Sequence, residues 1–216
     1  MGDLANPLID AKASTHATRA PVAPSRPPPT DPRTDFDTQL MLQVQQGDRE
    51  AANMLIRRNF ERVARYIGRV VRDSRQVEDL TQETLVQVLA NAGRFQPIAR
   101  FSTWLYRVAT NTALKYLTQS SVRSVVRTDD KLEKRDLADR ADAGPEQQCG
   151  LEELKSRVSD AINELPHNQR IALTLCEYEE LSYEQIASVL NVSVEGVRCL
   201  LQRARTTLRT RLAGLV

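Results

Sequence analysis

Apolar residues recur every three or four positions through most of the chain, which is the spacing of one face of an α-helix. Between residues 37 and 119 the pattern predicts four helices. They begin at Thr38 and Asp48, cover about 76–91, and run from Ser102 to about Gln119. Breaks fall at Gly47 and in the loop 92–101, which contains Pro97. No window alternates with a period of two for long enough to predict a strand, so the expected fold class is all-α.

The helical pattern resumes over 151–164 and 166–178, and residues 182–207 then predict two short helices joined by a tight turn. Ser182 and Gln185 have the spacing of a capping box, and Ser193 can cap the second short helix. Asn191 lies where the first helix must end in a left-handed residue, a conformation that Asn tolerates. This segment therefore predicts a helix-turn-helix.

The remaining segments carry little apolar periodicity. Residues 1–36 hold most of the ten prolines and predict a disordered tail, either a passive linker or a proline ligand for a partner. Residues 120–150 are polar and charged and predict a flexible linker. The expected organisation is thus two small helical domains, 37–119 and 151–216, on a tether.

Composition narrows the class of protein. The three cysteines are widely spaced with no CxxC pair, which argues against a disulfide framework or a structural zinc site. No apolar run approaches the roughly 20 residues that span a bilayer, and the acids Asp3 and Asp10 do not suit a secretory signal. We expect a cytoplasmic protein without membrane insertion.

Catalytic chemistry has little support. His16 lies in the tail and His167 at a helix start, and neither has a cluster of metal-ligand residues nearby in sequence. No phosphate-binding glycine loop or nucleophile motif is present. We expect no catalytic residue, no metal and no cofactor, and hence a protein that is not an enzyme.

The helix at 76–91 carries acids and amides off its apolar stripe. Glu78, Asp79, Gln82 and Glu83 form this patch. It is either a solvated helix face or a docking site for a basic helical partner, where charge would set orientation and encounter rate.

Four of the ten aromatic residues fall between positions 95 and 106, and basic residues are interleaved with them. Aromatic rings can stack unpaired bases while Arg and Lys follow phosphates. The candidates for holding single-stranded DNA are Arg94, Phe95, Phe101, Trp104, Arg107, Asn111 and Lys115. Thr110 is expected on the same outer face of the helix. The alternative is that some of the aromatic residues fill the core.

The last helix is basic, because five arginines and no acid follow from position 198 onward. A helix-turn-helix with such a second helix suits the DNA major groove, although a packed hairpin with a solvated arginine face gives the same pattern. Arg198 and Gln202 can make bidentate base contacts, and Glu195 can accept from a cytosine amine. The candidate set is Ser193, Glu195, Arg198, Cys199, Gln202, Arg203 and Arg205. Cys199 is either a small neutral filler or a redox-sensitive thiol.

Three stretches in this order carry a family resemblance: VEDLTQETLVQVL, FSTWLYRVATNTALKYL and LPHNQRIALTLCEYEELSYEQIASVLNVSVEGVRCLLQRARTTLR. The chain resembles bacterial RNA polymerase sigma factors of the extracytoplasmic-function class over about 37–119 and 151–212. The resemblance implies that the first domain is sigma region 2 and the second sigma region 4. Asp79, Gln82 and Glu83 would dock on the coiled coil of the largest catalytic subunit.

The same resemblance implies that the Phe95–Asn111 surface recognises and melts the minus-ten element and that residues 194–207 read the minus-thirty-five element. The implied partners are core RNA polymerase, promoter DNA and an anti-sigma protein, and the implied regulon is one of stress or envelope response. Gly196, Cys199 and Leu200 depart from the residues common in the family. An autonomous helix-turn-helix regulator and a helical adaptor are the competing hypotheses.

Overall fold

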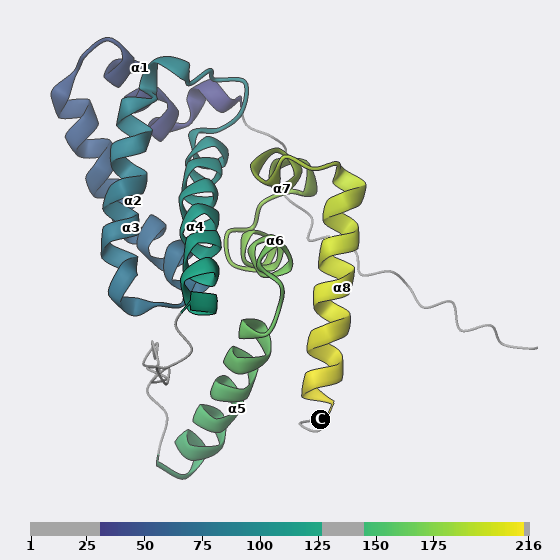
Figure 1. The fold of residues 1–216 in the computed structure, drawn as a ribbon. Coiled ribbons are helices and arrows are strands. Elements are labelled where there is room, and N and C mark those ends of the chain that lie inside the picture. The colour runs from purple at the N-terminus through teal and green to yellow at the C-terminus, as the bar shows by residue number, and fades with distance from the viewer. Residues whose placement is uncertain (1–30, 127–144, 214–216) are drawn as a thin grey trace, which may run out of the picture.

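The first half of the chain folds into four helices. The computed structural model describes residues 31–126 and 145–213, with side chains over 31–120 and 154–213. The helices are α1 (Phe36–Gln45), α2 (Arg49–Val71), α3 (Ser74–Ala90) and α4 (Phe101–Val126), with single 3-10 turns at Pro32–Thr34 and Ala92–Arg94. They pack together as one helical domain (Figure 1).

The second half also consists of four helices: α5 (Pro145–Asn163), α6 (His167–Glu177), α7 (Tyr183–Leu190) and α8 (Val194–Leu212). The helix-turn-helix prediction is confirmed in its details. Ser182 and Gln185 form the capping box, Asn191 is left-handed at φ 54° and ψ 47°, and the Ser193 hydroxyl accepts from the amide of Gly196. Within the described ranges no residue forms a strand, as the all-α prediction requires.

Two predicted helix starts are wrong by a few residues. Asp35, not Thr38, caps α1, because its carboxylate accepts from both the amide and the hydroxyl of Thr38 at 3.2 and 3.0 Å. A carboxylate at this position also suits the positive end of the helix dipole. Thr38 is buried instead, and its Oγ1 accepts from the amide of Phe101 at 3.1 Å. The start of α4 is therefore Phe101 rather than Ser102, and this bond ties it to α1.

Helix occupies both ends of the predicted linker, since α4 continues past Gln119 to Val126 and α5 begins at Pro145. The middle of that linker and residues 1–30 of the predicted tail lie outside the described residues.

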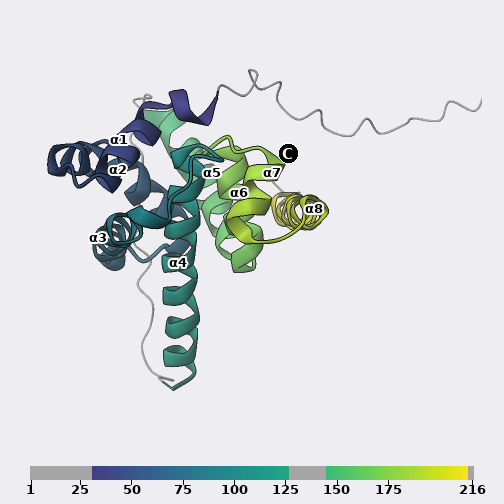
Figure 2. The same ribbon diagram turned by 90° about the horizontal axis from the view of Figure 1, so that it is seen from above.

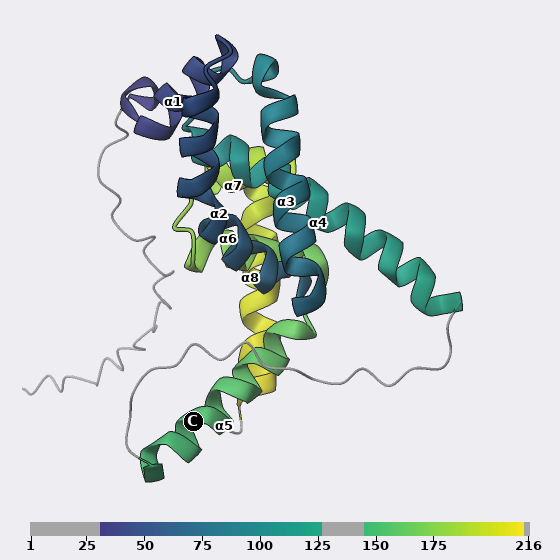
Figure 3. The ribbon, with the colours of Figure 1, turned by 90° about the vertical axis from the view of Figure 1, so that its left-hand side faces the viewer.

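The two domains pack against each other. Helix α4 of the first domain lies beside α7, and α2 contacts α6 (Figures 1 and 2). Helix α8 lies on the far side of α6 and α7 from the first domain and packs on α5 as well (Figure 3). The first turns of α4, at Thr103 and Arg107, thus meet the second domain, while Asn111 and Lys115 farther along the helix stay exposed.

Candidate nucleic-acid and protein interfaces

The acidic patch of α3 is only partly assembled as predicted. Glu78, Asp79 and Gln82 are exposed together, and the Gln82 amide donates to Glu78 at 3.3 Å. Glu83 is half-buried, and its carboxylate lies 3.5 Å from the Lys115 ammonium on α4. Three of the four predicted residues therefore form an open surface, and the fourth turns toward α4.

An apolar residue that the sequence reasoning missed extends this surface. Val86 lies one turn after Gln82 and is 65% exposed. The sequence could have indicated this exposure, because Val86 lies off the apolar stripe that includes the buried residues Leu85 and Val88. An exposed apolar side chain beside acids provides area for a docking partner in addition to charge.

Phe95 and Phe101 are core residues, which corrects their prediction as base-stacking candidates. They are 3% and 1% exposed, and each packs against Trp104, with ring centroids 5.4 and 6.0 Å apart. Phe95 meets Phe101 edge to face, the arrangement that aromatic quadrupoles favour. Of these three aromatic residues, Trp104 is half-buried, whereas Phe95 and Phe101 are buried.

Gln45 at the end of α1, another residue that sequence reasoning missed, holds the loop before α4 by hydrogen bonds. Its amide donates to the carbonyls of Ala92 and Phe95, both at 2.8 Å. On the outer side of the loop, Arg94 is exposed and Ile98 is 81% exposed. The aromatic residues therefore fix the conformation of the loop. Its outward surface carries the basic side chain of Arg94 and the apolar side chain of Ile98.

Arg107, Asn111 and Lys115 are exposed at intervals of four residues, so they share one face of α4. Thr110 does not join them as expected. It is buried, and its hydroxyl bonds to that of Tyr66 at 2.5 Å, because a hydroxyl inside a core needs a partner.

Arg107 is also engaged by the second domain. Its Nε donates to the backbone carbonyl of Ser188 in α7 at 3.1 Å, and its Nη2 to the Ser188 hydroxyl. One predicted DNA contact thus bonds to protein in this structure.

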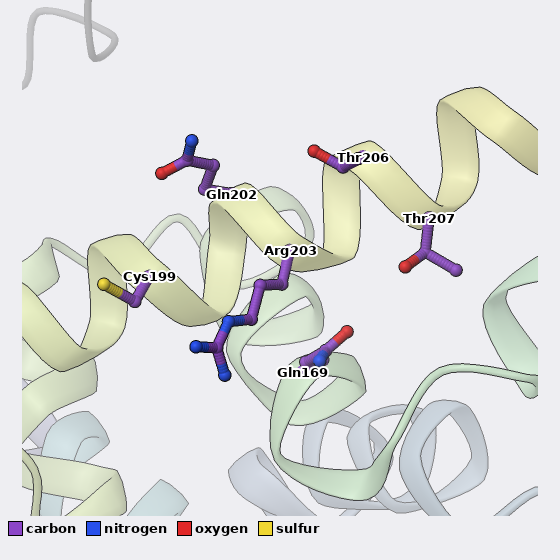
Figure 4. Close-up of a pocket in the computed structure, with 6 residues that line it drawn as sticks. All are labelled: Gln169, Cys199, Gln202, Arg203, Thr206 and Thr207. Carbon is purple, nitrogen blue, oxygen red and sulfur yellow. The ribbon is translucent and has the colours of Figure 1, made fainter.

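The second helix of the helix-turn-helix borders an open groove of about 570 Å³ (Figure 4). Cys199, Gln202, Arg203 and Thr206 of α8 line it together with Gln169 from the start of α6, a contributor that sequence reasoning missed. Figure 4 shows Arg203 and Gln169 approaching each other beneath α8, with Gln202 on its outer side. Exposed amide and guanidinium groups on one helix face can bond to base edges and phosphates.

Arg205 does not belong to this face. Its Nη2 donates to the Glu177 carboxylate at 2.9 Å, and this hydrogen bond is the main reason that its pKa is raised. Seven residues closer to the start of α8, Arg198 pairs with Glu195 at 3.0 Å while both stay exposed. Ser193 is exposed, but its hydroxyl is already used as the helix cap. The structure therefore separates one arginine of the predicted set from the rest.

Among the residues that the structure describes, no group of three or more His, Cys, Asp or Glu side chains could hold a metal ion. Over the same residues, every helix is too short or too polar to cross a bilayer. Cys199 is exposed and Cys176 half-buried, and burial raises the pKa of the Cys176 thiol.

Comparison with known proteins identifies both domains. The family model described as Sigma-70 region 2 matches residues 55–123, and that described as Sigma-70, region 4 matches residues 155–208. The RNA polymerase sigma-H factor of Pseudomonas aeruginosa is 34% identical over 184 residues, which are 83% of this chain and 95% of that protein. The chain belongs to the sigma-70 family, among the extracytoplasmic-function sigma factors. The corresponding sigma-E factor of Escherichia coli is also 34% identical, over 83% of this chain and 96% of its own length.

Solved sigma-factor structures share the fold. The structure of CnrH in complex with the cytosolic domain of CnrY covers 83% of this chain and 99% of that one, with a TM-score of 0.61 at 22% identity. The sigma factor RpoE in complex with the anti-sigma factor NepR from Bartonella quintana covers 81% and 95%, with a TM-score of 0.58 at 18% identity. The chain is thus a sigma factor that directs transcription initiation, and sigma factors are initiation factors rather than enzymes.

Proposed function

We propose that this sigma factor divides promoter recognition between its two domains, region 2 over 37–119 and region 4 over 151–216. Region 2 binds core RNA polymerase and the minus-ten strand, and region 4 reads the minus-thirty-five element as duplex. The observation that carries the proposal is the coexistence of three separate polar surfaces, on α3, α4 and α8, in a chain of this family.

The polymerase surface is assigned to the exposed patch of Glu78, Asp79 and Gln82, extended by Val86. Acids in the centre of the patch orient a basic helical partner and raise its encounter rate. Val86 provides apolar contact at the edge. Glu83 acts indirectly in this assignment, because its carboxylate faces Lys115.

The minus-ten surface comprises the outer face of α4 and the loop before it. Arg107, Asn111 and Lys115 can follow a strand along the helix, and the accessible part of Trp104 offers a stacking surface. Arg94 lies in the loop beside them. Phe95 and Phe101 support this surface from inside the core.

The minus-thirty-five surface is the exposed side of α8. Arg198 and Gln202 have the side chains for bidentate base contacts, and Arg203 with Gln169 can contact the phosphates that flank the groove. Arg205 is excluded from this set because it bonds to Glu177. Glu195 and Cys199 remain candidates at the base edges.

Control by a protein partner fits this chain. CnrH and the RpoE of Bartonella quintana were each solved with a protein partner, the latter with an anti-sigma factor. We propose an anti-sigma protein as the regulator here, a regulon of stress or envelope response, and the cytoplasm as the site of action, since core polymerase is there. We assign the chain no catalytic activity of its own.

Run-off transcription with purified core polymerase on a pool of genomic fragments tests the proposal. Added protein should create new start sites, and Asp79→Lys should abolish them without loss of fold. Glu61→Lys makes the same charge change at another exposed position of the first domain and should retain activity. Tight and selective duplex binding without polymerase would instead support the autonomous regulator.

A further inference from the structure

The first turn of α8 carries the only acid of that helix. Among the 19 residues from Val194 to Leu212, Glu195 is the single carboxylate, and five arginines follow it. A negative charge in the first turn suits the positive end of the helix dipole, but it opposes binding to the phosphates of DNA. Glu184 occupies the corresponding second position of α7, where the dipole acts in the same way. The dipole does not explain why the acid of α8 lies on the proposed DNA surface.

Glu195 is paired with Arg198 on the solvent side of α8. Its Oε2 accepts a hydrogen bond from Nη1 of Arg198 at 3.0 Å, and the two side chains are 71% and 60% exposed. The buried residues Val197, Leu201 and Ala204 lie on the other side of the helix. An ion pair this exposed contributes little to the stability of the fold, because water screens it and two long side chains must be ordered. The pair is thus better placed to meet a ligand than to support packing.

The hydrogen bond between the two side chains leaves each of them with groups that can contact a base. It uses Nη1 of Arg198, so Nε and Nη2 remain as a parallel pair of donors, and these suit the O6 and N7 acceptors of guanine. It uses Oε2 of Glu195, so Oε1 remains as an acceptor, which suits the N4 amine of cytosine. Neither side chain has to release the other to contact DNA.

These two targets belong to one base pair. In a G·C pair the cytosine N4 amine is hydrogen-bonded to guanine O6, so the two groups are neighbours in the major groove. A carboxylate and a guanidinium that already touch can therefore meet adjacent groups of a single pair. Their place along the chain agrees with this contact, because the N-terminal residues of the second helix in a helix-turn-helix contact the base edges.

We propose that Glu195 and Arg198 act as one unit that reads a single G·C pair of the minus-thirty-five element. Arg198 donates to guanine, and Glu195 accepts from the paired cytosine while it holds the guanidinium in place. Glu195 is then a specificity-determining residue. Its carboxylate rejects an A·T pair, because thymine presents the O4 acceptor where cytosine presents its amine. The inference rests on the proposed function for the entry of α8 into the groove.

Replacement of the carboxylate by an amide in Glu195→Gln should relax this selectivity. An amide can accept from cytosine N4 or donate to thymine O4, so the variant should tolerate both base pairs at this position. Discrimination of G·C against A·T should fall there by about tenfold and stay the same at the other positions of the element. The lost negative charge should raise the affinity for all promoters alike, which leaves their ratio unaffected.

The test is promoter binding by polymerase that carries the full-length chain. Each base pair of the upstream element, in a promoter found in the genomic pool, is replaced in turn, and relative affinities are measured by competition at one salt concentration. Glu184→Gln is the matched control, since it removes the same charge from the same position of α7, and it should leave discrimination unchanged at every pair. Arg198→Ala should affect the same pair as Glu195→Gln, and the double variant should lose less than the sum of the two losses.

Three results would overturn the joint reading. Unchanged discrimination in Glu195→Gln, with a clear preference in the unaltered protein, would do so and leave the proposed function standing. If Tm then fell in both Glu195→Gln and Glu184→Gln, the helix dipole alone would account for Glu195. Effects of Glu195→Gln and Arg198→Ala at different base pairs would separate the two residues. If the unaltered protein itself showed no preference at any pair, the minus-thirty-five assignment would fail and the joint reading with it.

Discussion

Arg198 and Arg205 are equivalent by sequence, since both lie in the basic helix, yet the structure predicts different consequences of replacing them by Ala. Arg198 is exposed on α8 one turn before Gln202, and its guanidinium pairs with the exposed Glu195. Arg205 turns toward Glu177 of α6. Arg198→Ala should therefore weaken promoter selectivity, and Arg205→Ala should mainly affect the packing of α8.

The magnitudes follow from the surroundings of each side chain. A bidentate contact to a base is worth about 1–3 kcal/mol of discrimination, which is about 5- to 150-fold in relative affinity. The pair of Arg198 with Glu195 is largely exposed, so its loss should change the free energy of unfolding by under ~0.5 kcal/mol. The pair of Arg205 with Glu177 is more than a third exposed on both sides, so after screening its loss should cost under ~1 kcal/mol.

The assay is competition between a promoter fragment and a mismatched fragment for polymerase carrying each variant. The fragment is chosen from the start sites found in the genomic pool, and thermal unfolding is measured in parallel. Arg198→Ala should lose discrimination at one base position with little change in Tm. Arg205→Ala should keep discrimination and unfold a few degrees lower. If Arg205→Ala lost as much discrimination as Arg198→Ala, the assignment of the α8 faces would be wrong.

Further predictions concern the scaffold, each followed by thermal or denaturant unfolding. Phe101→Ala should cost about 3–5 kcal/mol, because the ring is buried against Phe95 and Trp104; a loss under ~1 kcal/mol would refute its core role. Ser182→Ala removes the capping box of α7 and should cost about 1 kcal/mol. Burial raises the pKa of Tyr66 above its usual 10.0, so stability should fall as the pH rises above about 10, and less so in Tyr66→Phe.

Local signals were sufficient for the helix-turn-helix of the second domain. The capping box at Ser182, the left-handed turn at Asn191 and the cap at Ser193 each depend on residues within four positions, and all three formed as predicted. Such features are readable because helix ends have few ways to satisfy their unpaired amides. The cap of α1 was misassigned because Asp35 and Thr38 both have acceptor side chains.

The same local reasoning could not predict which side chains become buried or paired when the helices pack together. Phe95 and Phe101 follow no helical stripe in the loop, so nothing local distinguishes a core ring from a stacking surface. Thr110 looked polar and outward, but the partner that allows its burial, Tyr66, comes from another helix. The turn of Arg205 toward Glu177 likewise depends on a contact 28 positions away. These outcomes depend on which helices meet.

The chemistry of the domain contact suits separation as well as closure. Across it, Arg62 of α2 pairs with Glu179, Arg72 donates to the Ser159 carbonyl, and the Gln185 amide donates to the Thr103 hydroxyl. Polar contacts of this kind are typical of domains that move relative to each other. On separation, the Thr103 hydroxyl and the Arg107 guanidinium can bond to water or phosphate instead of α7. Leu105 and Ala109 remain covered by the core of the first domain, since they lie on the opposite side of α4 from Arg107. Helix α4 can therefore exchange a protein partner for a nucleic-acid strand without losing the core that holds it.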